Sequence, residues 1–231
     1  MRKRKQPEPI RPWTWPHYQA LHVCLPGLLR LLGGWRVVGQ DNVPETGGAV
    51  IAPNHVSYLD PPAVGSGLPR RTYSFAKKEL FDIPIFGWIL RKCYAFPVDR
   101  EISDIAAFRH AIRLLQAGEL LLVFPEGGRS ADGKLEQGRG GAALIASRAE
   151  VPLIPCSLCG TDDVLPHGAW FLHTGLVQVS FGPPIALGQY GNHRLNKTQL
   201  QEVTAQLMAS IAELRAEQEQ FARQRSRKNE R

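Results

Sequence analysis

Short apolar runs alternate with stretches in which apolar residues recur at helical spacing along most of this 231-residue chain. Short runs are typical of buried strands, and a recurrence every three to four residues is typical of helices that pack by one face. The pattern predicts strands at 49–52, 120–124, 153–158 and 177–181, and helices at 105–117, 142–148 and 198–225. It therefore predicts an α/β fold, a single domain with a central, mostly β-sheet core flanked by helices.

Two of these segments predict finer detail. Residues Val177–Phe181 alternate between apolar and polar side chains, so this strand is expected to have one solvated face. Thr198 and Gln201 have the spacing of a capping box at the start of the last helix. The buried face of that helix is expected to consist of Leu200, Val203, Leu207, Ile211 and Leu214.

A stripe near the N-terminus predicts an interfacial helical element that precedes the domain. Its residues are Tyr18, Leu21, Leu25, Leu28, Leu29 and Leu32, with Trp13 and Trp15 before them. Such a stripe is typical of a membrane anchor at headgroup level, and the alternative is packing on the protein's own core. Residues 12–29 lack Asp, Glu, Lys and Arg but contain three prolines and two histidines, which does not favour a membrane-spanning helix.

The charge distribution indicates an anionic partner. The net charge is +7, and much of the excess lies in the two ends of the chain. We therefore expect a basic tail and the amphipathic element at 1–34, the α/β domain at 35–222, and a basic, disordered tail at 223–231. No recognition motif for DNA or RNA occurs in the sequence, so nucleic acid is not the expected partner.

The four cysteines are too few and too scattered for a disulfide framework. Cys156 and Cys159 have the C-x-x-C spacing, but no second pair completes a zinc site and the segment is expected to be a buried strand. We therefore expect reduced thiols, a cytosolic setting and no bound metal.

An imidazole and a carboxylate lie five residues apart directly after the first predicted strand, at His55 and Asp60. Within a helix this spacing would point them about 140° apart. Pro61 and Pro62 favour a loop before them and a helix start at their own position, so the two side chains are free to pair. In such a pair, the carboxylate orients the imidazole while it removes a proton from an attacking hydroxyl.

A second polar segment, Phe124–Ser130, completes the strand predicted at 120–124 and offers a carboxylate, a Gly-Gly pair and a guanidinium. Chemistry in α/β sheets lies at the carboxyl ends of strands, where both polar segments are expected. No Gly-x-Ser-x-Gly motif occurs, so a hydrolase with a serine nucleophile is not predicted. Together the two segments indicate an acyl-transfer site.

With two further segments they resemble the PlsC-type glycerolipid acyltransferases, the 1-acylglycerol-3-phosphate acyltransferase family. The four matching blocks stand in family order, at Asn54–Asp60, Phe96–Arg100, Phe124–Ser130 and Val151–Pro155. The resemblance extends over roughly residues 35–190. Two positions depart from the pattern, because many members have threonine at Gly128 and a Phe-Lys pair in place of Gly138-Arg139.

The resemblance implies transfer of a fatty acyl group from an acyl-CoA or acyl carrier protein thioester to the free hydroxyl of lysophosphatidic acid, giving phosphatidic acid. No other cofactor is implied. His55 is then the general base, Asp60 is its orienting carboxylate, and the arginines suit a phosphate group. The expected substrate-binding residues are Lys77, Arg100, Glu126, Gly127, Gly128, Arg129 and Arg139.

The resemblance also favours membrane association through the N-terminal element, at the cytoplasmic face and on an anionic lipid surface, as a peripheral or monotopic protein. Two alternatives stay open. In the first alternative, the acceptor is glycerol 3-phosphate, another lysophospholipid, or a lipid amine or alcohol. The second alternative is a membrane-peripheral binding protein without activity.

Overall fold

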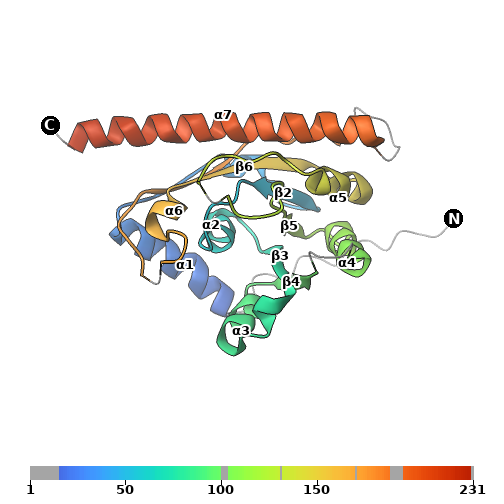
Figure 1. The fold of residues 1–231 in the computed structure, drawn as a ribbon, viewed down its shortest axis with the longest axis horizontal. Helices are drawn as coiled ribbons and strands as arrows, with labels where there is room; N and C mark the ends of the chain where they lie inside the picture. Colours follow the sequence, from blue (N-terminus) through green and yellow to red (C-terminus); the bar gives the residue numbers. More distant parts are fainter. Residues whose placement is uncertain (1–15, 100–103, 131, 170, 188–194, 230–231) are drawn as a thin grey trace.

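A computed structural model describes residues 16–99, 104–130, 132–169, 171–187 and 195–229. Figure 1 shows a central sheet between helices, with the long helix α7 (Lys197–Asn229) running across one side of the molecule. Within the described ranges, seven strands form one sheet in the order β1 (Trp35–Val38), β7 (Val177–Phe181), β6 (Leu153–Cys159), β2 (Ala49–Pro53), β5 (Leu120–Leu122), β3 (Thr72–Lys77) and β4 (Ala95–Val98).

Helices cover both faces of the sheet. The first face carries α1 (Pro16–Leu31), α2 (Asp60–Gly67) and the short α6 (Thr161–Val164); the second carries α4 (Ile105–Gln116), α5 (Gly141–Ala149) and α7. Beside β4 lies α3 (Pro84–Lys92), preceded by the 3₁₀ turn η2 (Lys78–Phe81), and a second 3₁₀ turn, η1 (Gln40–Asn42), follows β1. In β2, Ile51 belongs to the core cluster of the first face and Val50 to that of the second. Burial on both faces explains the uninterrupted apolar run of this strand.

The topology brings the two predicted site segments together. Strand β2 pairs in parallel with β5 and β6, and β3 pairs in parallel with β5 and β4. Only the far side of the sheet differs, where β7 runs antiparallel to β6 and β1 runs parallel to β7. The carboxyl ends of β2 and β5 therefore lie side by side, and so do the loops that follow them.

The α/β class and the seven segments predicted from hydrophobic patterning are confirmed, with boundary shifts of up to four residues. The pattern did not indicate β1, β3, β4 or α3. Strands β1 and β4 have four residues each and are mostly only partly buried, and β3 has the polar residues Thr72 and Ser74 at buried positions, so none of the three gives a clear apolar run.

Three details of the prediction are wrong. Strand β7 has no solvated face, because all five of its residues are buried. The capping box lies two residues earlier than predicted: Asn196 N–H donates to Gln199 Oε1, and Gln199 N–H donates to Asn196 Oδ1, both at 2.9 Å.

The basic C-terminal segment continues α7 through Asn229 and is not a disordered tail over that stretch. Arg225 donates to the carbonyl of Gly33, 2.8 Å away, which ties this end of α7 to the chain after α1.

Four leucines of the N-terminal stripe pack on the protein's own core, and a fifth, Leu28, is 42% exposed. Leu25 and Leu29 are buried in the core cluster of the first face, and Leu21 and Leu32 pack against it. The predicted use of this stripe as a lipid-facing anchor is therefore wrong for these four leucines, because helical periodicity shows that a face is buried but not what buries it. Trp13, Trp15 and the side chain of Tyr18 lie outside the described residues. In the part of the chain that the structure describes, no helix is long and apolar enough to cross a membrane.

Candidate active site

The loop after β2 holds His55 and Asp60 in contact. Nδ1 of His55 lies 2.7 Å from Oδ2 of Asp60, which also accepts hydrogen bonds from the backbone amides of Val56 and Ser57 at 2.7 and 2.8 Å. Helix α2 begins at Asp60 with prolines in its first turn, as the sequence predicts, so the carboxylate turns back over the loop. Asp60 is fully buried and the side chain of His55 is 10% exposed.

The loop after β5 packs against this pair. The ring of Phe124 stacks on the imidazole of His55 with centroids 3.8 Å apart. The backbone of His55 is held from both sides, since its N–H donates to Oε2 of Glu126 at 3.0 Å and its carbonyl accepts from the amide of Ser130 at 2.8 Å. The two catalytic-site loops are therefore joined by direct hydrogen bonds, and the imidazole plane is fixed.

Glu126 serves as a backbone anchor in this arrangement. Its second oxygen, Oε1, accepts from the amide of Glu136 at 3.3 Å, so both carboxylate oxygens are engaged. Burial raises the pKa of Glu126 to about 7, although the amides of His55 and Glu136 lower it. No ion pair joins Glu126 to Arg129 among the described residues, and the carboxylate instead sets the positions of two loop segments.

Asn54 is a site residue that sequence reasoning missed. Its side-chain amide donates to the carbonyl of Leu158 at 3.0 Å, and its oxygen accepts from the amide of Leu158 at 2.8 Å. This side chain extends the ladder between β2 and β6 by one rung beyond Pro53, which has no N–H to give. A primary amide offers a donor and an acceptor together, so an asparagine directly after a strand and before His55 was the available signal.

The predicted substrate-binding cations take different positions. The guanidinium of Arg129 lies over the ring of Tyr58, 3.6 Å from its centroid. Arg139 passes over Gly127, whose φ is +76° and where a Cβ would approach the arginine side chain to 3.0 Å. The side chain of Lys77 is half exposed, and its Nζ lies 3.7 Å from Oε2 of Glu79.

The remaining predicted residues add less. Arg100 lies outside the described residues. At Gly128 a Cβ would meet no atom within 4 Å, so nothing in the local packing demands glycine there. At Gly138 a Cβ would come within 2.7 Å of Met208 on α7, so that position has no room for an aromatic side chain.

A cavity of about 420 Å³ opens beside His55. Its wall includes Arg129 and Lys77, but most of it is apolar and comes from α1, β3, η2, α3, β5 and the segment after β5: Leu21, Leu25, Phe75, Ala76, Leu80, Phe86, Ile89, Leu90, Leu122 and Phe124. One imidazole and two cations beside a mostly apolar space suit a substrate with a reactive polar group, an anionic group and a hydrocarbon chain.

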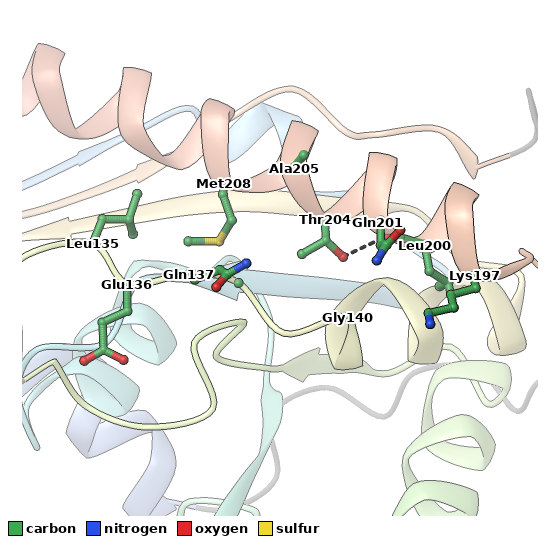
Figure 2. A pocket seen from close by; sticks show the side chains of 11 residues that line it. Leu135, Glu136, Gln137, Gly140, Lys197, Leu200, Gln201, Thr204, Ala205 and Met208 are labelled. Atoms are coloured by element: carbon green, nitrogen blue, oxygen red, sulfur yellow. Dashed lines mark hydrogen bonds between the residues drawn. The ribbon is translucent and has the colours of Figure 1, made fainter.

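A larger hollow of about 770 Å³ lies elsewhere, between the segment 135–140 and the first turns of α7. Figure 2 shows that Thr204 and Met208 point into it from α7 while the carboxylate of Glu136 turns away. No catalytic-site side chain lines this hollow, and Thr204 is already bonded to the carbonyl of Leu200 at 2.6 Å. The smaller cavity is therefore the candidate site.

The geometry defines one reactive atom. Because Nδ1 of His55 is held by Asp60, the tautomer leaves Nε2 to accept a proton. No hydrogen bond to Nε2 from the described residues competes with a substrate hydroxyl, and His55 lines the cavity. A charged partner at Nδ1 stabilises the imidazolium that forms when a hydroxyl is deprotonated.

Comparisons with known proteins agree with this site. Residues 34–159, more than half of the chain, match the family model described as "Acyltransferase". The 1-acyl-sn-glycerol-3-phosphate acyltransferase of Bacillus subtilis (strain 168) is 34% identical over 189 residues, covering 81% of this chain and 91% of that protein. The protein of the same name from Streptococcus pneumoniae is 30% identical over 210 residues, covering 87% and 75%.

A solved structure has a similar fold. The crystal structure of the 1-acyl-sn-glycerophosphate acyltransferase PlsC from Thermotoga maritima matches with a TM-score of 0.69 at 26% sequence identity, covering 86% of this chain and 80% of that one. The matched range contains both site loops, from Asn54 through Ser130. The chain belongs to the PlsC-type acyltransferase family and is an acyltransferase.

Proposed function

We propose that this acyltransferase moves a fatty acyl group from a coenzyme A or acyl carrier protein thioester to the free hydroxyl of lysophosphatidic acid, giving phosphatidic acid for phospholipid synthesis. The observation that carries the proposal is the His55–Asp60 pair at the wall of a mostly apolar cavity that Arg129 also lines. The relatives from Bacillus subtilis and Streptococcus pneumoniae carry the name of this activity.

The reaction is a direct transfer. Nε2 of His55 takes the proton of the acceptor hydroxyl as its oxygen attacks the thioester carbonyl, and the carbon–sulfur bond breaks to release the thiol. The imidazolium returns the proton to the sulfur. General-base assistance of this kind is worth about 10²–10⁴ in rate. No covalent enzyme intermediate is required, and no cofactor beyond the thioester donor takes part.

Arg129 supports recognition of the acceptor phosphate. A guanidinium presents two parallel donors to a phosphate, and the ring of Tyr58 holds this one flat beside the cavity. Lys77 lines the same cavity, and Arg139 lies beside the loop that carries Arg129. The apolar walls suit a fatty acyl chain, whose burial contributes about 0.8 kcal/mol per CH₂.

We also propose that the protein works as a peripheral or monotopic protein at the cytoplasmic face of an anionic membrane. A lysophospholipid acceptor and a membrane-resident product place the cavity near lipid, and a net charge of +7 favours anionic headgroups. Leu25 and Leu29 of the predicted stripe pack in the core, whereas Leu28 is 42% exposed, so most of this stripe is not available to lipid.

The test is acyl transfer from one acyl-CoA, and separately from one acyl carrier protein thioester, to a panel of acceptors. The panel contains lysophosphatidic acid, glycerol 3-phosphate, a lysophospholipid with a substituted phosphate, a monoacylglycerol and a lipid amine. We expect the highest kcat/KM with lysophosphatidic acid. Equal transfer to the monoacylglycerol would reject phosphate recognition, and preference for another acceptor would reassign the substrate. No transfer to any acceptor from a folded protein would favour the inactive binding protein.

A further inference from the structure

The outer side of α3 is apolar and exposed. The side chains of Ile85, Trp88 and Ile89 are 77%, 55% and 42% exposed. Their spacing of three and four residues places them in one stripe along the helix. Lys92 continues the stripe by one turn, and Arg91 adds a second cation at the same end of the helix. These five residues are called the α3 surface below.

The inner side of α3 is fixed against the body, so the stripe cannot turn inward. Gly87 touches the chain of η2 so closely that a Cβ there would lie 2.3 Å from the carbonyl oxygen of Phe81. Leu90 packs on the buried cluster formed by Ala76, Phe81 and Ala95. The exposure of the α3 surface is therefore a consequence of how the helix is docked.

The α3 surface is continuous with the catalytic cavity. Phe86, Ile89 and Leu90 contribute to the cavity wall, together with Leu21 and Leu25 of α1. Ile89 takes part in both, because it lines the cavity and is also 42% exposed. Apolar surface thus runs without interruption from the outside of α3 to the space beside His55.

We infer that the α3 surface rests on an anionic lipid leaflet, with Ile85, Trp88 and Ile89 at the boundary between headgroups and acyl chains. Interfacial helices combine an apolar face with basic residues, and tryptophan is typical of the headgroup level. The ammonium group of Lys92 lies 5.8 Å from the centre of the Trp88 ring, so a cation and an aromatic ring meet the same layer. Lys92 then faces lipid phosphates, and Arg91, whose guanidinium lies 5.4 Å from the centre of the Phe81 ring, adds positive charge at the same end of the helix.

This inference deepens the proposed function, on which it rests for the lipid nature of the acceptor. It moves the membrane contact from the α1 stripe, where Leu25 and Leu29 are buried, to the rim of the cavity that the lipid must reach. A lysophospholipid leaving the leaflet beside Ile89 would pass from one apolar surface to the other without crossing water, while its phosphate is drawn toward Arg129.

The experiment measures binding of the full chain to phosphatidylcholine vesicles with and without phosphatidylglycerol, in the absence of acyl donor. The test variant is Ile85→Glu/Trp88→Glu, because neither residue lines the cavity. We expect its binding to mixed vesicles to weaken about tenfold or more. Ile105→Glu is the matched control, since it places the same charge on an exposed isoleucine in the first turn of α4. We expect it to bind as the wild type does.

Arg91→Gln/Lys92→Gln tests the headgroup contact. We expect binding to the mixed vesicles to weaken about fivefold for each cation lost, and binding to phosphatidylcholine alone to stay unchanged. Acyl transfer to a short-chain, water-soluble lysophosphatidate by the Ile85→Glu/Trp88→Glu variant should match that of the wild type, which shows that the fold and the chemistry are intact.

Wild-type vesicle binding by the Ile85→Glu/Trp88→Glu variant would overturn the inference. So would a change from dimer to monomer in light scattering with unaltered vesicle binding, because the α3 surface would then join two copies of the chain. Loss of vesicle binding with retained short-chain transfer separates this inference from the proposed function, which stands or falls on the acceptor panel.

Discussion

Two clusters of buried polar side chains flank strand β6, and they differ in how fully their hydrogen bonds are satisfied. The first joins β6 and β7 to α7. Gln218, fully buried, accepts from Ser157 Oγ at 2.8 Å and donates to Ser157 O and Ser180 Oγ at 2.9 Å. Its backbone carbonyl accepts from Gln178 at 3.0 Å. Both heteroatoms of the buried Gln218 amide therefore have protein partners.

The second cluster is the active site, and some of its hydrogen-bonding atoms have no partner among the described residues. Oδ2 of Asp60 accepts three hydrogen bonds while Oδ1, also buried, accepts none from the described residues. His55 has one ring nitrogen engaged and lines the cavity with the other available. Buried polar groups are nearly always satisfied, so the unpartnered Oδ1 of Asp60 makes the active site the less completely satisfied of the two clusters.

We expect the largest effect from removing the imidazole of the incomplete cluster. His55→Ala removes the proton acceptor, so we expect kcat for acyl transfer to fall by about 10²–10⁴ with the melting temperature nearly unchanged. Asp60→Asn should also lose activity while substrate binding persists, because the amide no longer stabilises the imidazolium. Steady-state kinetics and thermal unfolding measure both.

His167→Ala is the control, since His167 is exposed and outside the cavity. It should leave kcat unchanged. Retention of more than a small fraction of wild-type turnover by folded His55→Ala would remove His55 from the role of general base.

For the satisfied cluster around Gln218, we expect an effect on stability and not on kcat. Gln218→Leu leaves Ser157 and Ser180 without their buried partner, and we expect the free energy of unfolding to fall by about 3 kcal/mol. Urea denaturation measures the loss. Gln206→Leu, on the exposed side of the same helix, should change it by less than about 0.5 kcal/mol. A loss of kcat in Gln218→Leu at temperatures where it is folded would break the distinction between the clusters.

At the cavity wall, the expected effect is on binding. Arg129→Ala removes a charge-assisted hydrogen bond worth about 1.5–3 kcal/mol, so KM for a phosphorylated acceptor should rise about tenfold to a hundredfold. The KM of the thioester donor should change little, and substrate-saturation curves for each substrate separate the two.

The ring under Arg129 sharpens this measurement. Tyr58→Leu removes a cation–π contact worth about 0.5–1 kcal/mol and should raise the same KM a few fold. Tyr58→Phe keeps the ring and should match the wild type. Equal KM values for all three Tyr58 forms would mean that the stack does not position Arg129.

The last prediction concerns pH. Because the pKa of Glu126 is raised from 4.5 to about 7 by burial, the native state holds a proton that the unfolded state releases in this interval. The contribution of Glu126 is complete below about pH 4.5 and is lost as the pH rises through about 7. Glutamine does not titrate, so the stability of Glu126→Gln relative to the wild type should increase as the pH rises between these values. Unfolding curves at pH 4.5, 6 and 8 test it; a constant difference would deny the raised pKa.

Local sequence signals predicted the centre of the site. The five-residue spacing of His55 and Asp60 and the prolines after them were enough to place the pair in a loop, because backbone restrictions act over a few residues. The same is true of Glu126 as part of the second loop. What Glu126 bonds to was not predictable, because the amide of Glu136 reaches it through the path of a long loop.

The sequence pattern does not show which faces are covered by segments that lie far away along the chain. Gln178 and Ser180 alternate with valines as if one face of β7 were exposed to solvent. Helix α7 covers that face: Gln218, 38 residues beyond Ser180, bonds to Ser180 through its side chain and to Gln178 through its backbone carbonyl. The stripe of α1 and the outer stripe of α3 pose the same problem with opposite outcomes. Both helices have an apolar stripe, although the sequence pattern had indicated only that of α1, and tertiary packing decides whether protein covers it.

The hydrogen bonds that join the two active-site loops have a consequence for exchange with solvent. The amides of His55 and Ser130 are both donated inside the protein, and each belongs to a loop attached to a central strand of the sheet. Their protons would exchange only when that centre opens, so the loops share the slow cooperative unit of the sheet. Substrate access therefore cannot use an opening of these loops and falls to the rim, where α1 and α3 meet the cavity.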